Sequence, residues 1–226
     1  MFVWLRNHPL WTAVTIGAGT MITFKYIRDK IRNSNQEILD IMIFNELSGK
    51  CDSGHPKKEA LNCPNKYCSK RHIQRIVQQI DQAVYSIDIA IYTFTTIEIL
   101  EAFYRALDRG VTIRVISDPE MLSSTGSKVL SLKSSGVEIR MPETTALMHH
   151  KFLVIDGGAR VKSLLRVKDG RKKPTCVVGA VFYGSANWTA QGFKGNWENC
   201  VLSSDKLLTN RFQAEFDRMW TSFKRY

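Results

Sequence analysis

Residues 149–156 contain side chains that can attack and hold a phosphate group. His149, His150 and Lys151 are followed, after four apolar residues, by Asp156, which gives the pattern H-x-K-x4-D. Side chains alternate between the two faces of a strand, so His149 and Lys151 share one face and His150 lies on the other. An imidazole nucleophile beside a fixed cation is suited to phosphoryl transfer. Asp156, at the end of the strand, is expected to orient its neighbours rather than to contact the substrate.

A second polar motif follows in the same half of the chain. Gly184, Ser185 and Asn187 form the pattern G-S-x-N, and Ser185 and Asn187 again lie two residues apart. Their hydroxyl and amide groups can donate hydrogen bonds to phosphoryl oxygens. Glu198 can hold an imidazole in the reactive tautomer, as carboxylates do in catalytic triads. The predicted catalytic residues are therefore His149, Lys151, Asp156, Ser185, Asn187 and Glu198.

The two motifs together resemble the signature of the phospholipase D superfamily, in which an H-x-K-x4-D (HKD) motif is followed by G-S-x-N. The resemblance extends from about Ile73 to the C-terminus. Within the superfamily, the chain is similar to the Zucchini, or mitochondrial cardiolipin hydrolase, group. The shared features are an apolar N-terminal segment, a Cys/His cluster, residues 148–152 and residues 184–189. The resemblance implies an α/β, phospholipase D-like sheet flanked by helices.

The resemblance also implies a mechanism with two histidines. One attacks phosphorus to form a phosphohistidine, and the other protonates the leaving oxygen and then activates water. The superfamily needs two HKD motifs and this chain has one, so we expect a homodimer in which both His149 residues meet at the two-fold axis. We expect no catalytic metal, because Lys151 and the polar donors supply the charge stabilisation.

The charge of the chain indicates an anionic partner. The formal net charge is +11, which is typical of proteins that bind nucleic acid or anionic lipid. Much of it lies in a basic insertion, residues 157–178, which we expect beside the active site, where it would follow a phosphodiester backbone. A solvated basic hairpin without a ligand is the alternative. The predicted substrate-binding residues are Arg160, Lys162, Arg166, Lys168, Arg171, Lys172 and Lys173.

Three functions remain open at this stage. The first, by resemblance to the Zucchini group, is a metal-independent endonuclease that cuts single-stranded RNA and processes piRNA precursors at the mitochondrial surface. The second is a phospholipase that hydrolyses cardiolipin to phosphatidate. The third is an inactive RNA-binding or scaffold protein, which the intact motifs disfavour. The basic insertion favours RNA over cardiolipin, since lipid hydrolysis requires apolar surface around the site.

A dense group of soft metal ligands precedes the catalytic motifs. The best four-ligand set is Cys51, Cys63, Cys68 and His72, with the spacing C-x11-C-x4-C-x3-H, and His55 is an alternate ligand. The final C-x3-H matches the CCCH zinc site of the Zucchini group. A closed set of four ligands predicts structural zinc in the segment 51–72. Five cysteines, an odd number, favour a reducing compartment over a disulfide framework.

The N-terminus has the character of a membrane anchor. Residues 7–24 are 18 residues without a formal charge, long enough to reach roughly 27 Å as a helix. Basic residues follow directly, so the positive-inside rule puts the rest of the chain in the cytosol. We therefore expect an anchor with its basic flank over 1–32 and a single catalytic domain over 33–226. The anchor is expected to span the mitochondrial outer membrane once, and the endoplasmic reticulum is the alternative that the sequence leaves open. A cleaved signal peptide and a buried amphipathic helix are the alternatives.

Alternating strands and helices must position these side chains. Residues 73–84 have apolar side chains at helical spacing, and residues 85–92 alternate as a strand does. The same reasoning along the chain predicts helices over 71–84, 97–107, 125–135 and 208–220 and strands over 85–92, 111–116, 137–140, 152–155 and 176–182. This order of elements is typical of an α/β layered fold.

Overall fold

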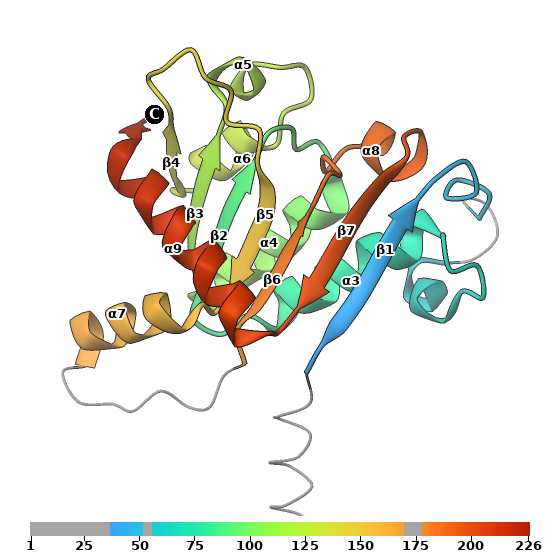
Figure 1. Ribbon diagram of the computed structural model, residues 1–226, viewed down its shortest axis with the longest axis horizontal. Coiled ribbons are helices and arrows are strands. Elements are labelled where there is room, and N and C mark those ends of the chain that lie inside the picture. Colours follow the sequence, from blue (N-terminus) through green and yellow to red (C-terminus); the bar gives the residue numbers. More distant parts are fainter. Residues whose placement is uncertain (1–36, 52–55, 170–177) are drawn as a thin grey trace, which may run out of the picture. The chain divides into compact units, whose positions relative to one another are not determined.

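An eight-stranded mixed sheet forms the centre of the computed structural model, which describes residues 37–51, 56–169 and 178–226 (Figure 1). The strand order is β1-β7-β6-β5-β2-β3-β4-β8, in which β2, β3 and β4 are parallel and the other neighbours antiparallel. The strands are β1 (Leu39–Phe44), β2 (Ser86–Ile91), β3 (Thr112–Ser117), β4 (Glu138–Met141), β5 (Lys151–Ile155), β6 (Ala180–Gly184), β7 (Glu198–Ser203) and β8 (Lys224–Arg225).

Helices cover both faces of the sheet. The helices α3 and α4 pack on one face and the long helix α9 crosses the other, as Figure 1 shows. The helical elements are η1 (Lys57–Asn62), α3 (Ser69–Gln82), α4 (Ile97–Asp108), α5 (Pro119–Leu122), α6 (Val129–Ser134), α7 (Gly158–Asp169), α8 (Ala190–Lys194) and α9 (Lys206–Ser222). The predicted α/β sheet flanked by helices is therefore confirmed.

The central strands are buried on both faces because helices cover both faces. All residues of β2 and β5 are buried, as expected for strands between two helical layers. The helix α3 presents Ile73, Ile76 and Ile80 to the sheet and polar side chains to solvent. Its apolar stripe stabilises the helix chiefly through burial against the sheet rather than through helix propensity.

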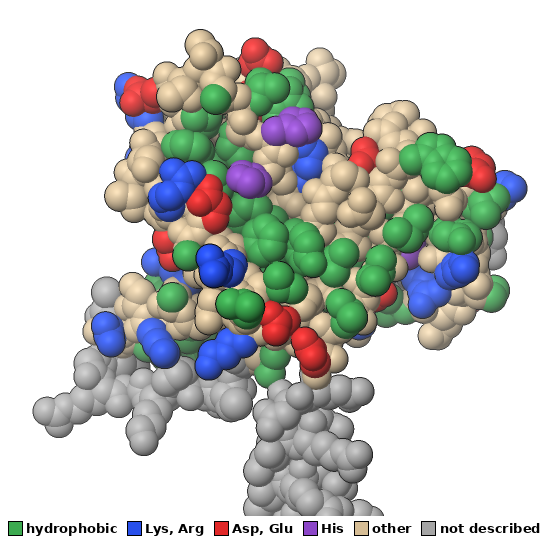
Figure 2. All heavy atoms as spheres, in the orientation of Figure 1, with side chains coloured by type: hydrophobic (Ala, Val, Ile, Leu, Met, Phe, Trp, Pro, Cys, Tyr) green, Lys and Arg blue, Asp and Glu red, His purple; other side chains and the backbone are tan. Residues whose placement is uncertain are grey.

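The helix α9 covers only part of its face of the sheet. Sheet pairing aligns Ile41 of β1 with Val201 of β7, Val201 with Tyr183 of β6, and Tyr183 with Phe152 of β5. Phe212 of α9 contacts the rings of Tyr183 and Phe152, with centroid distances of 4.9 and 5.0 Å. Ile41, at the other end of this row, is 58% exposed. Figure 2 shows hydrophobic side chains over β6, β7 and β1 on this face.

A buried charge cluster joins α9 to the sheet. The guanidinium of Arg114 donates two hydrogen bonds to Asp88, at 2.7 and 2.6 Å, and one to Asp217, at 2.7 Å. Gln213 Nε2 donates to the same Asp88 carboxylate at 2.8 Å. The Asp88 side chain is 1% exposed and that of Arg114 is 10% exposed. Each buried charge thus has a partner, which burial of ions requires.

Several predicted elements need correction. The strand expected over 176–182 is instead β6, Ala180–Gly184, and the helix expected over 125–135 is the shorter α6, Val129–Ser134, preceded by α5. The described part of the basic insertion is the helix α7 and not a hairpin. The strands β1 and β7 were not predicted at all. Both faces of β1 are apolar, with Met42 buried and Ile41 exposed, so the alternation that identifies an amphipathic strand is missing.

The predicted membrane anchor, residues 1–32, lies outside the described residues. Glu37–Tyr226 forms one compact unit. Among the helices of the described part, none has both the length and the apolar character needed to cross a bilayer. The anchor and the domain boundary at residue 33 therefore stay predictions.

Candidate active site

His149 and Lys151 lie at the start of β5, at the end of the sheet where β2 and β6 finish and β7 begins. Lys151 pairs with Ile91, the last residue of β2. The Lys151 side chain turns back and its Nζ donates to the backbone carbonyl oxygen of His149 at 2.8 Å. Lys151 is buried, whereas His149 is exposed. This arrangement holds an ammonium group directly beside the imidazole-bearing residue.

Tyr92 contacts both His149 and Lys151 through its ring, and it was not identified from the sequence. Its ring meets the His149 ring edge-on, with 4.7 Å between centroids, and Lys151 Nζ lies 5.1 Å from the Tyr92 ring centroid. The backbone N–H of Tyr92 donates to the carbonyl oxygen of His150 at 3.1 Å. His150 instead contacts Phe152 on the opposite side of the strand, at 5.3 Å. His149 and Lys151 therefore lie on one side of the strand and His150 on the other, as the alternation of side chains predicts.

Burial changes the protonation chemistry of this group. The pKa of Lys151 is lowered from its usual value of 10.5 because burial disfavours the charged amine, and the negative charge of Glu198 partly offsets this effect. The pKa of His150 is likewise lowered, mainly by burial. Lys151 is thus a partly desolvated cation, which interacts more strongly with an anionic ligand than a cation in bulk water does.

The G-S-x-N residues border the same end of the sheet. Ser185 follows β6, and its Oγ accepts a hydrogen bond from the backbone N–H of Asn199 at 3.1 Å. Asn187 Oδ1 accepts from the backbone N–H of Thr93, next to Tyr92, at 3.3 Å. The amide N–H groups of Asn187 are then the part that can donate to a phosphoryl oxygen. The two motifs are therefore joined through the end of β2.

Glu198 opens β7 and accepts a hydrogen bond from Asn196 Nδ2 at 3.1 Å. It influences Lys151 electrostatically, and within the described part of the chain it makes no hydrogen bond to His149. A role for Glu198 in holding an imidazole stays a prediction for an assembled site.

Asp156 lies at the far end of β5 from His149. The strand between Lys151 and Asp156 spans roughly 17 Å at the rise of an extended chain. The Asp156 carboxylate accepts hydrogen bonds from the backbone N–H groups of Val84, Tyr85 and Ser86, at 2.9, 2.7 and 2.8 Å. Its backbone is left-handed, with φ of 49°. Asp156 thus ties the end of β5 to the start of β2, which agrees with the expected orienting role.

The helix α7, which forms the described part of the basic insertion, does not begin beside His149, where the sequence led us to expect the insertion. Because it follows Asp156, α7 begins at the opposite end of β5 from the catalytic motif. Lys162 and Arg166 on α7 are exposed, whereas Arg160 is half-buried, near the charges of Arg114, Asp88 and Asp217. Lys168 also lies on α7, and Arg171, Lys172 and Lys173 lie outside the described residues.

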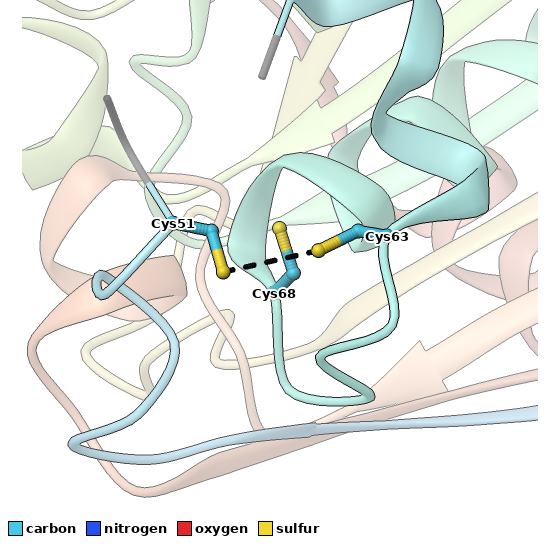
Figure 3. A group of neighbouring side chains, drawn as sticks. All are labelled: Cys51, Cys63 and Cys68. Atoms are coloured by element: carbon cyan, nitrogen blue, oxygen red, sulfur yellow. Dashed lines mark hydrogen bonds between the residues drawn. The ribbon is translucent and has the colours of Figure 1, made fainter. Parts of the chain in front are cut away.

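Three of the four predicted zinc ligands come together. The sulfur atoms of Cys51, Cys63 and Cys68 all lie within 4.8 Å of one another, as Figure 3 shows. Cys51 Sγ and Cys63 Sγ are 3.8 Å apart. Two thiolates on one tetrahedral zinc, each ~2.3 Å from the metal, are separated by ~3.8 Å. Burial raises the pKa of Cys68 to about 11, a cost that a bound cation removes. The sulfur geometry therefore fits zinc.

His72 is not a member of that sulfur group, although it is close in sequence. It lies one turn after Cys68 in α3, and its backbone N–H donates to the Cys68 carbonyl oxygen at 3.1 Å. The His72 side chain is buried, contacts Phe44 edge-on at 5.0 Å, and its Nε2 has no hydrogen-bond partner among the described residues. Burial lowers its pKa to about 4, so His72 is neutral and able to ligate. The alternate ligand, His55, lies outside the described residues.

The sequence is similar to proteins of known family. Residues 76–220 match the family model described as "Cardiolipin synthase, PLD-like domain". The mitochondrial cardiolipin hydrolase of Drosophila melanogaster is 41% identical over 97% of this chain and 92% of its own length. The protein of the same name from Chlamydomonas reinhardtii is 31% identical over 72% of this chain and 65% of its own length.

Solved structures share the fold. Nuc from Salmonella typhimurium, described as a phospholipase D family member, superposes with a TM-score of 0.59 at 19% identity, covering 84% of this chain and 99% of Nuc. NucT from Helicobacter pylori superposes with a TM-score of 0.58 at 19% identity, covering 84% of this chain and all of NucT. At this identity the likeness extends to the fold alone.

Proposed function

Because this chain belongs to the family of phospholipase D-like (PLD-like) domains, we propose a two-histidine hydrolysis of phosphodiesters at the end of the sheet where β5 begins. The protein is a PLD-family phosphodiesterase. The proposed site rests on one observation: the His149 ring and the Lys151 ammonium both contact the Tyr92 ring. Asn187 accepts a hydrogen bond from the backbone N–H of the neighbouring Thr93. In this proposal the nucleophile, the cation and the amide donor act on the same phosphate.

The proposed chemistry divides one displacement into two steps. The imidazole of His149 attacks phosphorus, forming a P–N bond as the P–O bond to the leaving group breaks. His149 of the partner subunit gives its proton to the leaving oxygen and then takes a proton from the water that cleaves the P–N bond. Lys151, Ser185 and Asn187 stabilise the charge on the phosphoryl oxygens in both steps.

A homodimer supplies the second histidine. The uncovered apolar face of β1, where Leu39, Ile41 and Ile43 are 67, 58 and 39% exposed, supports a contact between two copies of this chain. This face continues along β7 to the end of the sheet that holds the motifs, because Ile43 pairs with Asn199, next to Glu198. A second copy on this face would bring its own motif towards the first.

Single-stranded RNA is the proposed substrate. The net charge of +11 supports a long anionic polymer, which is attracted by the whole surface rather than by the site alone. The basic helix α7 lies too far from His149 to hold the scissile phosphate, so we assign it to a distant part of the strand. In this proposal the protein processes piRNA precursors and leaves 5′-phosphate ends.

Cardiolipin is the second candidate substrate. It is supported by the names of the relatives and by Leu147, an apolar side chain 57% exposed only two residues before His149. Lipid hydrolysis needs such apolar surface beside the phosphate to receive acyl chains. The reaction at phosphorus would be the same for both substrates.

We place the protein in the mitochondrial outer membrane. This chain matches 92% of the length of the Drosophila relative, and the name of that relative supports a mitochondrial location. The anchor over 1–32 would span the membrane once and leave the catalytic domain in the cytosol. Zinc held by Cys51, Cys63, Cys68 and His72 would fix the segment before α3 without taking part in catalysis.

The test compares both substrates under the same conditions. The full chain in detergent is incubated with end-labelled single-stranded RNA, and separately with cardiolipin liposomes, in EDTA, which removes free divalent cations. RNA fragments with 5′-phosphate and 3′-hydroxyl ends are expected, and single-stranded DNA is also cut because the mechanism does not use the 2′-hydroxyl. Intact RNA together with release of phosphatidate would overturn the RNA assignment and establish the lipid reaction.

A linked dimer tests the shared site. Two copies joined in one polypeptide, one wild-type and one with His149→Ala, should have almost no activity, because each site needs both histidines. The matched control is a linked pair of wild-type copies. Half of the control activity in the mixed pair would refute the two-histidine site, since it would show that each copy acts alone.

A further inference from the structure

The end of β2 connects the two catalytic motifs, although it belongs to neither. Tyr92 N–H donates to His150, and Thr93 N–H donates to the Asn187 side chain. The backbone N–H of Trp188 donates to the Thr93 carbonyl oxygen at 3.1 Å. Residues 92 and 93 therefore hold the HKD and G-S-x-N segments in fixed positions relative to each other.

The Tyr92 ring is the side chain of this segment that contacts the reacting groups. His149 comes before the first residue of β5 and is exposed, so the strand itself does not fix its imidazole. The edge-on ring contact at 4.7 Å limits the orientations of that imidazole. On the same ring, the Lys151 ammonium lies 5.1 Å from the centroid, within the range of a cation–π contact.

We propose that Tyr92 is a positioning residue for hydrolysis, whose aromatic ring aligns the His149 imidazole and the Lys151 ammonium on one phosphate. This inference rests on the proposed function, since it assigns Tyr92 a task in that reaction. The ring is the working part: the contacts to His149 and Lys151 both involve the ring, and the described contacts do not include one from the phenolic hydroxyl to either group.

Alignment of this kind affects turnover more than binding. A nucleophile displaced by ~1 Å from its line of attack can lose about 100-fold in rate. Substrate binding depends on charge, which Lys151 retains when the ring is replaced. Loss of the ring should therefore lower kcat and leave KM nearly unchanged.

Two substitutions at Tyr92 separate the ring from the hydroxyl. Tyr92→Leu removes the ring, and Tyr92→Phe removes only the hydroxyl. Tyr104→Leu is the matched control, because it also replaces a partly buried tyrosine ring, on α4. All variants are made in the full chain, and circular dichroism compares their folding.

The kinetic measurement uses bis(p-nitrophenyl) phosphate, a phosphodiester that is neither RNA nor lipid. We expect Tyr92→Leu to lower kcat by about 10- to 100-fold with little change in KM, while Tyr92→Phe and Tyr104→Leu stay close to wild type. Loss of activity in Tyr92→Phe equal to that in Tyr92→Leu would overturn the assignment to the ring. So would a rise in KM at unchanged kcat, or wild-type kcat in Tyr92→Leu.

A second measurement does not depend on turnover. The imidazole signals of His149 are recorded by NMR, with His150 as the internal reference because its ring faces Phe152 instead. Tyr92→Leu should shift and broaden the His149 signals, whereas Tyr92→Phe should leave them sharp. Unchanged His149 signals in Tyr92→Leu would overturn the proposal. An inactive wild-type protein with these expected signals would refute the proposed function and leave the positioning contact established.

Discussion

Replacing Asp156 tests whether the third residue of the HKD motif acts in structure or in chemistry. Its Oδ1 accepts from the N–H groups of Tyr85 and Ser86, and its Oδ2 accepts from that of Val84. Asp156→Ala removes all three acceptors. Asp156→Asn keeps an acceptor oxygen for two of the donors and sets an N–H₂ group against the third. The two variants should therefore differ in stability in a defined order.

The magnitude follows from these contacts. A hydrogen bond to a charged group contributes about 1.5 kcal/mol at the low end of its range, so Asp156→Ala, which loses three, costs about 4.5 kcal/mol. An alanine in the left-handed backbone at φ of 49° adds about 1 kcal/mol. The sum, about 5.5 kcal/mol, lies at the low end of the range for the whole stability of a typical domain. Asp156→Asn loses one bond and the charge on the others, about 2 kcal/mol.

Urea unfolding of the full chain, followed by circular dichroism, measures this order. With a dependence of about 2 kcal/mol per molar urea, Asp156→Ala should lower the midpoint by about 2.7 M and Asp156→Asn by about 1 M. Below its unfolding transition, Asp156→Asn should keep most of the wild-type kcat, because the carboxylate lies at the far end of β5. A stable Asp156→Asn protein without turnover would refute this reasoning, as would a wild-type urea midpoint for Asp156→Ala.

Three further predictions follow from the described contacts. Arg114→Met leaves the buried Asp88 carboxylate without its cation and should lower the free energy of unfolding, measured by urea denaturation, by about 3–5 kcal/mol. The control is Arg105→Met, which breaks an exposed ion pair with Asp81 and should change the free energy of unfolding only slightly. Burial lowers the pKa of Lys151, so the protonated amine is lost as the pH rises through a value below 10.5, and kcat/KM should fall over the same range. Glu198→Gln removes the negative charge that raises this pKa. The alkaline limb of the pH profile of kcat/KM should therefore move to still lower pH in this variant. Purified protein should contain about one zinc per protomer by atomic spectroscopy. Removal of the zinc by a strong chelator, or the substitution Cys63→Ser, should lower the Tm. The control is Cys200→Ser, which lies outside the sulfur group and should leave the zinc content unchanged.

The catalytic motif could be predicted from the sequence because it is local. His149, Lys151 and Asp156 lie on β5 or within two residues of its ends, and the alternation of side chains along an extended chain decides which of them share a face. Tyr92 could not be found in this way. It reaches His149 because β2 pairs with β5, and the sequence between these strands does not identify which strands become neighbours.

The zinc ligands show the same division. Spacing, together with the C-x3-H match to the Zucchini group, identified Cys51, Cys63, Cys68 and His72 as ligands with His55 as the alternate, and the three sulfurs do lie together. His72 lies outside the sulfur group, although it is only four residues from Cys68 in α3, so its place as the fourth ligand stays a prediction. Spacing along the chain determines which ligands are near in sequence, whereas side-chain packing, here against Phe44, decides where each donor atom lies.

The basic insertion shows what only the tertiary structure decided. Composition determined that residues 157–178 carry positive charge, and their position in the chain, between the two motifs, favoured a place beside the active site. The insertion follows Asp156, so the length of β5 separates the start of α7 from His149. Residue types and local alternation are properties of the chain, and the sequence by itself determines them. Proximity between segments depends on the direction and order of the strands, which the packing of the whole sheet determines.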